Sequence, residues 1–63
     1  MTSYTITNTR SGFDLGTYKG ETALHAIAAF HRDAGYRADV VDGELVTDAP
    51  EADLSALKAT EAK

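Results

Sequence analysis

The alternation of apolar and polar residues predicts two paired strands at the start of the chain. Residues 4–9 are rich in Thr, Tyr and Ile, and residues 13–18 return after a turn signal at Ser11-Gly12. Alternation gives each strand one apolar face. On the first strand this face holds Tyr4 and Ile6, and on the second strand it holds Phe13 and Leu15. Two such faces predict a helix laid over them.

The next segment has the spacing of an amphipathic helix that begins after Thr22 and ends before Gly35. Thr22 can act as the N-cap, and Gly35 can take the left-handed conformation after the last turn. The apolar stripe of this helix consists of Ala23, Leu24, Ile27, Ala28, Phe30, His31 and Ala34. We interpret His31 as a residue at the edge of the core, bonded to the backbone or to a tyrosine. The alternative is a pH-sensitive contact with a partner.

An Asp-Gly pair between β-branched runs predicts a hairpin over residues 38–47, because a type I′ turn needs positive φ at both central residues. In this register Val40 faces Leu45, and Asp39 faces Val46. The predicted inner face holds Ala38, Val40, Leu45 and Thr47. The predicted outer face holds Arg37, Asp39, Val41, Glu44, Val46 and Asp48.

The last part of the chain predicts a second, short helix. Asp48 can cap it, Pro50 fits its first turn, and Glu51 stands where a capping box has an acid. The residues up to about 60 are rich in Ala and Glu, and Leu54 and Leu57 are the only large apolar residues among them. We therefore expect a short helix that ends in a frayed tail.

The predicted order of elements is ββαββα, with a frayed tail at residues 59–63. This order indicates an α+β protein in which one main helix packs on an antiparallel sheet. With 63 residues the chain makes one small domain, residues 1–63, and it has no Cys to form a disulfide staple. We see no signal peptide and no apolar run of the ~20 residues that a membrane span needs, so we expect a cytoplasmic protein of a bacterial host cell.

Negative charge is concentrated in the second half of the chain. From Asp33 to Asp53 there are seven acids and one base, a formal charge of −6, whereas the whole chain carries −4. Such a block argues against direct binding to nucleic acid, because like charges repel. Duplex DNA carries one charge per ~1.7 Å of axis, so six charges match roughly 10 Å of duplex.

No residue pattern in the chain identifies a reaction that the protein could catalyse. Ser3, Ser11 and Ser55 have no histidine placed to activate them, and His25 and His31 are too far apart around a helix to chelate one ion. The acids lack the offsets of a calcium-binding EF-hand loop, although a weak Mg²⁺ or Ca²⁺ site stays an alternative. We expect no enzyme, no catalytic residue, no metal site and no cofactor.

The acidic block is the candidate site, and we expect it to bind a protein. Acids mixed with exposed apolar residues are more typical of a protein interface than of a purely solvated face. The alternative is that the acids only keep the protein soluble. The predicted partner-binding residues are Asp33, Asp39, Asp42, Glu44, Asp48, Glu51 and Asp53, together with Val41 and Val46.

The first half of the chain resembles small bacterial ββα proteins of unknown function. The resemblance covers residues 4–36 and depends on residues 11–22 (SGFDLGTYKGET), Ala26-Ile27 and Asp33-Ala34-Gly35-Tyr36. It supports the ββα unit and implies no activity. Those proteins often have Pro and Glu after the capping Thr, whereas this chain has Ala23-Leu24-His25, so the capping box is lost.

In its size, its lack of Cys and its acidic second half, the chain also resembles the phage-encoded anti-CRISPR proteins. Several members of that class are acidic and block the DNA-reading subunit of a CRISPR effector. The resemblance implies an inhibitor that presents a DNA-mimicking surface to a basic groove and blocks PAM recognition, as a monomer or weak homodimer. The alternative is a housekeeping domain that forms a homodimer through the hairpin at residues 38–47.

Overall fold

The computed structural model describes residues 1–50 and 56–62, which form strands and one helix in an α+β arrangement. The α+β class is therefore confirmed. In chain order the described elements are β1 (Thr2–Asn8), β2 (Asp14–Gly20), α1 (Ala23–Asp33), β3 (Ala38–Val41), β4 (Glu44–Thr47) and β5 (Leu57–Glu61).

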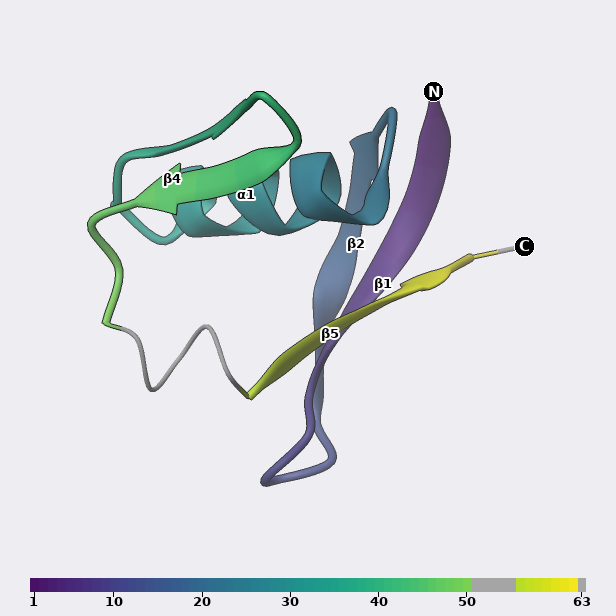
Figure 1. Ribbon diagram of the computed structural model, residues 1–63. Helices are drawn as coiled ribbons and strands as arrows, with labels where there is room; N and C mark the ends of the chain where they lie inside the picture. The colour runs from purple at the N-terminus through teal and green to yellow at the C-terminus, as the bar shows by residue number, and fades with distance from the viewer. Residues whose placement is uncertain (51–55, 63) are drawn as a thin grey trace.

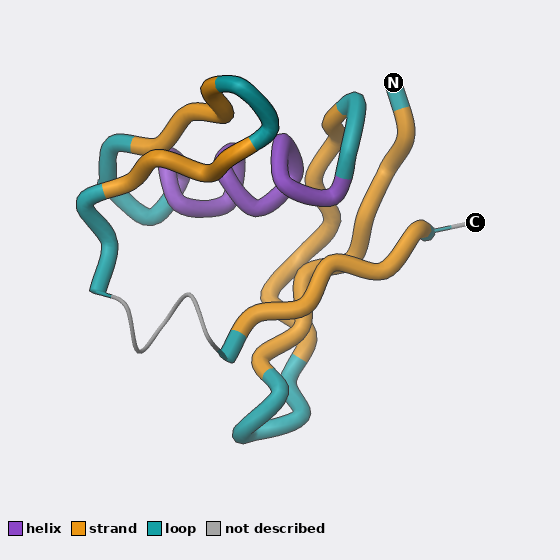
Figure 2. Tube along the Cα trace, viewed as in Figure 1, coloured by secondary structure: helices purple, strands orange, loops and turns teal. Residues whose placement is uncertain are grey.

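The strands form two antiparallel sheets rather than the one that we predicted. One sheet has the order β2-β1-β5, and the other is the hairpin β3-β4. Helix α1 packs against both sheets, and Figure 1 shows the hairpin lying along the helix, apart from the three-stranded sheet. The helix is therefore the element that joins the two halves of the fold (Figure 2).

The first hairpin forms as predicted, but its ladder contains a bulge. Ile6 pairs with Gly16, whereas Thr7 pairs with Asp14, so Leu15 is the extra residue on β2. The bulge breaks the simple alternation that we predicted for this strand. Phe13 lies before the strand and is 71% exposed, so it does not join Leu15 on an apolar face.

Both ends of α1 are capped by the predicted residues. At the start of the helix, the Thr22 hydroxyl accepts a hydrogen bond from the backbone N–H of His25 at 3.4 Å. At the other end, Gly35 has a φ of +99° and donates to Arg32, and the N–H of Tyr36 donates to the carbonyl of His31. These two bonds form a Schellman motif, which ends the helix and turns the chain toward β3.

The second hairpin has the predicted register. Val41 pairs with Glu44, Val40 with Leu45, and Asp39 with Val46. Positive φ values of 52° at Asp42 and 77° at Gly43 match the expected type I′ turn.

The end of the chain differs from the prediction. Residues 57–61 form strand β5, which pairs with β1 from Asn8↔Leu57 to Tyr4↔Glu61, so they are neither helical nor frayed. The pairing continues beyond the strand, because Ala62 donates to the carbonyl of Ser3. The high helix propensity of Ala misled the prediction, since the open edge of β1 offers this segment a ladder of backbone hydrogen bonds.

The core is made mainly of small side chains. Among the described residues, Ile6 and His31 are the largest fully buried ones, and the others that are buried in the core are Ala26, Ala28, Ala49 and Ala56. The helix can come close to β2 because Gly20 has no side chain. A Cβ placed on Gly20 would lie 2.6 Å from the backbone nitrogen of Ala26, which is closer than real Cβ atoms approach.

Replacing Gly20 by alanine should therefore destabilise the protein, because the new methyl group must push α1 away from β2. We expect Gly20→Ala to lower the free energy of unfolding by about 1–3 kcal/mol in a urea titration. Gly12→Asn is the matched control, because no atom outside the neighbouring residues lies within 4 Å of that position and Asn tolerates its φ of +77°. A loss for Gly20→Ala no larger than that for Gly12→Asn would contradict the close contact.

Removing residues 59–63 should also destabilise the protein, because it deletes the pairing of β5 with Tyr4, Thr5 and Ile6. At roughly 1 kcal/mol for each lost backbone hydrogen bond, we expect a loss of about 2–4 kcal/mol, measured by thermal or urea unfolding. Lys58→Ala, which removes an exposed side chain of β5 and leaves the ladder intact, should change little. If the truncated protein unfolded at the same urea concentration or temperature as the full chain, the prediction of a frayed tail would be correct and the pairing of β5 would not contribute to stability.

Candidate functional site

The outer face of the β3–β4 hairpin combines exposed acids with exposed valines. Val41 is 50% exposed and Val46 is 57% exposed, and Asp39 and Glu44 are exposed beside them. The inner residues Ala38, Val40, Leu45 and Thr47 are half-buried against the rest of the molecule. We call the outer set the acidic hairpin face, which consists of Asp39, Val41, Asp42, Glu44, Val46 and Asp48.

The strand register decides how the acids and valines are arranged on this face. Glu44 lies opposite Val41, and Asp39 lies opposite Val46. Each acid on the strands therefore faces a valine across the ladder, which avoids the repulsion of like charges directly opposite each other. The turn places Asp42 at the tip, so the two valines are surrounded by carboxylates.

Hydrogen bonds close the base of the hairpin and hold it in place. The backbone N–H of Arg37 donates to Asp48 Oδ1 at 2.8 Å, and the N–H of Asp48 donates to the carbonyl of Arg37 at 3.2 Å. The Thr47 hydroxyl donates to the same carbonyl at 2.7 Å. Arg32 of α1 donates from its guanidinium to the carbonyl of Ala38 at 2.9 Å, which ties β3 to the helix.

These bonds change the role that we predicted for Asp48. Its carboxylate was expected to cap a second helix, but it accepts a hydrogen bond from Arg37 across the end of the hairpin, and residues 48–50 are not helical. Asp48 therefore holds the face together and also adds a carboxylate to it, since the residue is exposed.

The structure brings together four of the seven predicted acids. Asp39, Asp42, Glu44 and Asp48 lie on the acidic hairpin face. Asp33 lies elsewhere, because its Oδ2 accepts a hydrogen bond from the hydroxyl of Tyr18 on β2 at 2.8 Å. The other two predicted acids, Glu51 and Asp53, lie outside the described residues.

In the described part of the chain the hairpin also has backbone edges without a neighbouring strand. On the edge of β3, Arg32 donates to the carbonyl of Ala38, and the N–H of Val40 donates to Asp39 Oδ1, so the edge of β4 is the more open of the two. Within residues 1–50 and 56–62, β3 and β4 pair only with each other, so each strand has one side without a neighbouring strand. Such edges can pair with a strand of another chain. The face and its edges together present apolar, charged and backbone groups that a protein partner could contact.

In the part of the chain that the structure describes, no three His, Asp or Glu side chains come close enough to hold a metal ion together. No helix among these residues is both long and apolar enough to cross a membrane.

The sequence analysis missed a pocket at the C-terminal end of α1. It lies between the helix and the three-stranded sheet, and its lining includes Leu15, Phe30 and Leu57. Nothing in the sequence pattern pointed to it, because we had placed Leu57 on a helix and paired Leu15 with Phe13.

Comparison with known proteins finds no family model, no curated protein and no solved structure that matches this chain. The inferences about function therefore depend on the geometry and charge of the described residues.

The hydrogen bond between Tyr18 and Asp33 predicts a measurable pH effect. The bond to the Asp33 carboxylate raises the pKa of Tyr18 above its ordinary value, and burial and the negative charge of Asp33 add to the shift. The folded state thus favours the neutral phenol. The stability that this bond contributes is fully present below the unfolded pKa of about 10 and is lost as the pH rises through the folded pKa.

We expect Asp33→Asn to lower the pKa of Tyr18, because both the acceptor and its charge are changed. NMR can resolve the ionisation of Tyr18 from that of the other tyrosines. Glu21→Gln is the control, because Glu21 is an exposed acid outside this hydrogen bond. If Tyr18 ionised at the same pH in the native chain and in Asp33→Asn, the bond to Asp33 would not be the cause of its raised pKa.

Proposed function

We propose that this protein is a non-enzymatic inhibitor that binds another protein through the acidic hairpin face. The observation that carries the proposal is the exposure of Val41 and Val46 among carboxylates on a hydrogen-bonded hairpin. Exposed valines cost free energy in water, and burying both against a partner would recover on the order of 1–3 kcal/mol each. The surrounding acids would select a partner with a basic surface.

The basic surface that fits best is a groove that normally holds nucleic acid. Four carboxylates on the face correspond to roughly 7 Å of duplex DNA, at one charge per ~1.7 Å of axis. This length is shorter than the 10 Å expected from the whole acidic block, because Asp33 bonds to Tyr18 of β2 and because Glu51 and Asp53 lie outside the described residues. The face would therefore imitate about two base pairs and occupy a site that reads a short element.

A PAM-reading site of a CRISPR effector is a site of this kind, because such effectors read a short DNA motif with basic side chains. The proposed activity is thus that of an anti-CRISPR protein, which acts in the cytoplasm of a bacterial host and blocks DNA recognition. The small size of the chain and its lack of Cys support this proposal. The partner would be the effector protein, with no direct contact to nucleic acid.

The second candidate function is a housekeeping domain that forms a homodimer through the hairpin at residues 38–47. The edge of β4, which has no neighbouring strand among the described residues, and the exposed valines favour it, because a second copy could pair with this edge or pack on the valines. In that case the acids would serve solubility. Two identical acidic faces repel each other, so such a dimer should be stronger at high salt.

Reversing two charges on the face should separate these functions. We expect Asp39→Lys with Glu44→Lys to weaken binding to the DNA-reading subunit of a CRISPR effector at least about tenfold, because two attractive contacts become repulsive. Binding of the native chain should also fall steeply with added salt. Binding can be measured by interferometry against a panel of purified effectors, with a DNA cleavage assay beside it.

Glu21→Lys with Glu61→Lys is the matched control, because it makes the same change of charge at exposed acids that are not part of the acidic hairpin face. Equal binding by the control and by the hairpin variant would reject the acidic hairpin face as the binding surface. A tight dimer in light scattering, disrupted by Val46→Lys and accompanied by no effector binding, would favour the housekeeping function instead.

A further inference from the structure

The register of the β3–β4 hairpin determines which backbone groups point to its two edges. In an antiparallel ladder, hydrogen-bonded pairs alternate with pairs whose N–H and C=O groups point outward. At the base of the hairpin the N–H of Asp48 donates to the carbonyl of Arg37, so this pair is of the first kind. The preceding residue of β4, Thr47, therefore belongs to an outward-pointing pair, and by the same alternation so does Leu45.

The outward groups of β3 are partly occupied, whereas those of β4 are open. On β3, the carbonyl of Ala38 accepts a hydrogen bond from Arg32 at 2.9 Å. The N–H of Val40 donates to Asp39 Oδ1 at 2.8 Å. Among the described residues, no hydrogen bond reaches the outward N–H and C=O groups of β4, and no strand lies beside them. This edge therefore offers two donors and two acceptors to another chain.

The side chains along this edge define which strand would fit it. Glu44, Val46 and Asp48 alternate on the outer face, and all three are exposed. A strand laid beside β4 places one side chain opposite each of them, at about 4.5–5.5 Å between Cβ atoms. Lys or Arg opposite each acid and an apolar residue opposite the valine would complement all three. Arg37, which pairs with Asp48, lies on the β3 side of the hairpin and away from this edge.

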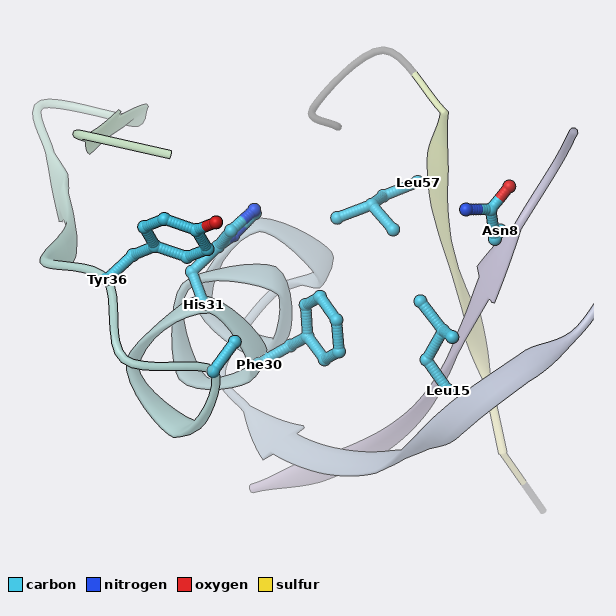
Figure 3. A pocket seen from close by; sticks show the side chains of 7 residues that line it. Asn8, Leu15, Phe30, His31, Tyr36 and Leu57 are labelled. Carbon is cyan, nitrogen blue, oxygen red and sulfur yellow. The ribbon is translucent and has the colours of Figure 1, made fainter. Parts of the chain in front are cut away.

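We propose that β4 binds an extended basic segment of the partner protein, which adds to the hairpin as a third, antiparallel strand. The segment has the pattern basic–x–apolar–x–basic, and its two x residues exchange four backbone hydrogen bonds with Leu45 and Thr47. This inference rests on the proposed binding through the acidic hairpin face and adds how the partner binds there. The pocket between Phe30 and Leu57 (Figure 3) shares no residue with this edge.

A second copy of this chain is a poorer occupant of the edge. Its own β4 carries the same acids, so pairing of two copies would gather the carboxylates of two faces along one line. Like charges on neighbouring strands are destabilising, whereas the charges of a basic segment are attracted to the acids. The occupant is therefore a basic segment of a different protein.

The test titrates the blocked peptide acetyl-Lys-Thr-Val-Thr-Lys-amide into the full chain, and NMR follows the backbone amides of Leu45 and Thr47. We expect saturable shifts at both amides, with a Kd on the order of 1 mM for four backbone hydrogen bonds and two exposed ion pairs. The same peptide with Glu in place of both Lys should bind at least about fivefold more weakly. Absence of saturable shifts, or equal affinity for the acidic peptide, would overturn the proposal.

Methylated peptides separate strand pairing from attraction between charges. A methyl group on the amide nitrogen of the second threonine removes a donor that faces β4, so it should weaken binding at least about tenfold. The matched control carries the methyl group on the amide nitrogen of the central valine, which points away from β4, and its Kd should change less than about twofold. A loss for the valine peptide as large as that for the threonine peptide would overturn the strand pairing.

A pair of variants extends the test to the effector. Thr47→Pro removes the outward N–H of β4 and is compatible with an edge strand, whereas Thr47→Val removes the hydroxyl that bonds to Arg37 and keeps the N–H. We expect Thr47→Pro to bind the peptide and the effector at least about tenfold more weakly than Thr47→Val. Because the comparison of peptides uses the native chain, a variant that fails to fold leaves the test intact.

Two further outcomes would overturn this inference without touching the proposed function. The first is effector binding that is lost in Asp39→Lys with Glu44→Lys but kept in folded Thr47→Pro, which would leave the acidic hairpin face as the binding surface and reject the added strand. The second is a set of shifts at Leu45 and Thr47 that depend on protein concentration without peptide, which would assign the edge to a second copy.

Discussion

The close approach of α1 to β2 at Gly20 is the contact on which the rest of the structure depends. A Cβ at this position would collide with the backbone of Ala26, so only glycine lets the helix lie this near the sheet. The buried methyl groups of Ala26 and Ala28 suit the same short distance. The consequence is that few large side chains are fully buried in the described part of the chain, where Ile6 and His31 are the largest of them. A domain of this size is only marginally stable, so it relies on strand pairing as well as on apolar burial.

Both candidate sites follow from the position of the helix between two sheets. On one side, α1 covers the inner residues of the β3–β4 hairpin and leaves Val41 and Val46 exposed among acids. On the other side, the end of the helix and the three-stranded sheet leave a pocket into which His31 is buried. The acidic hairpin face and the pocket therefore have no lining residue in common.

The candidate protein-binding face could be predicted from the sequence only where local geometry determines it. The alternation of β3 and β4 and the Asp42-Gly43 turn correctly placed the valines among acids, since a two-residue loop allows a single register. Asp33 and Asp48 were predicted as partner-binding residues, and Asp48 also as the cap of a second helix, yet they accept hydrogen bonds from Tyr18 and Arg37. Those donors are 15 and 11 residues away in the chain, and no local pattern reveals such pairs.

The sequence by itself determined the elements whose signals are local: the Thr22 cap, the Gly35 Schellman motif and the type I′ hairpin. Tertiary structure decided the bulge at Leu15, the division into two sheets, the strand at residues 57–61 and the pocket. The physical reason is clearest for β5. Helix propensities differ by only tenths of a kcal/mol per residue, whereas each backbone hydrogen bond to the open edge of β1 contributes about 1 kcal/mol. That edge comes from residues about 50 positions earlier in the chain, so the outcome depends on the folded sheet and not on the segment itself.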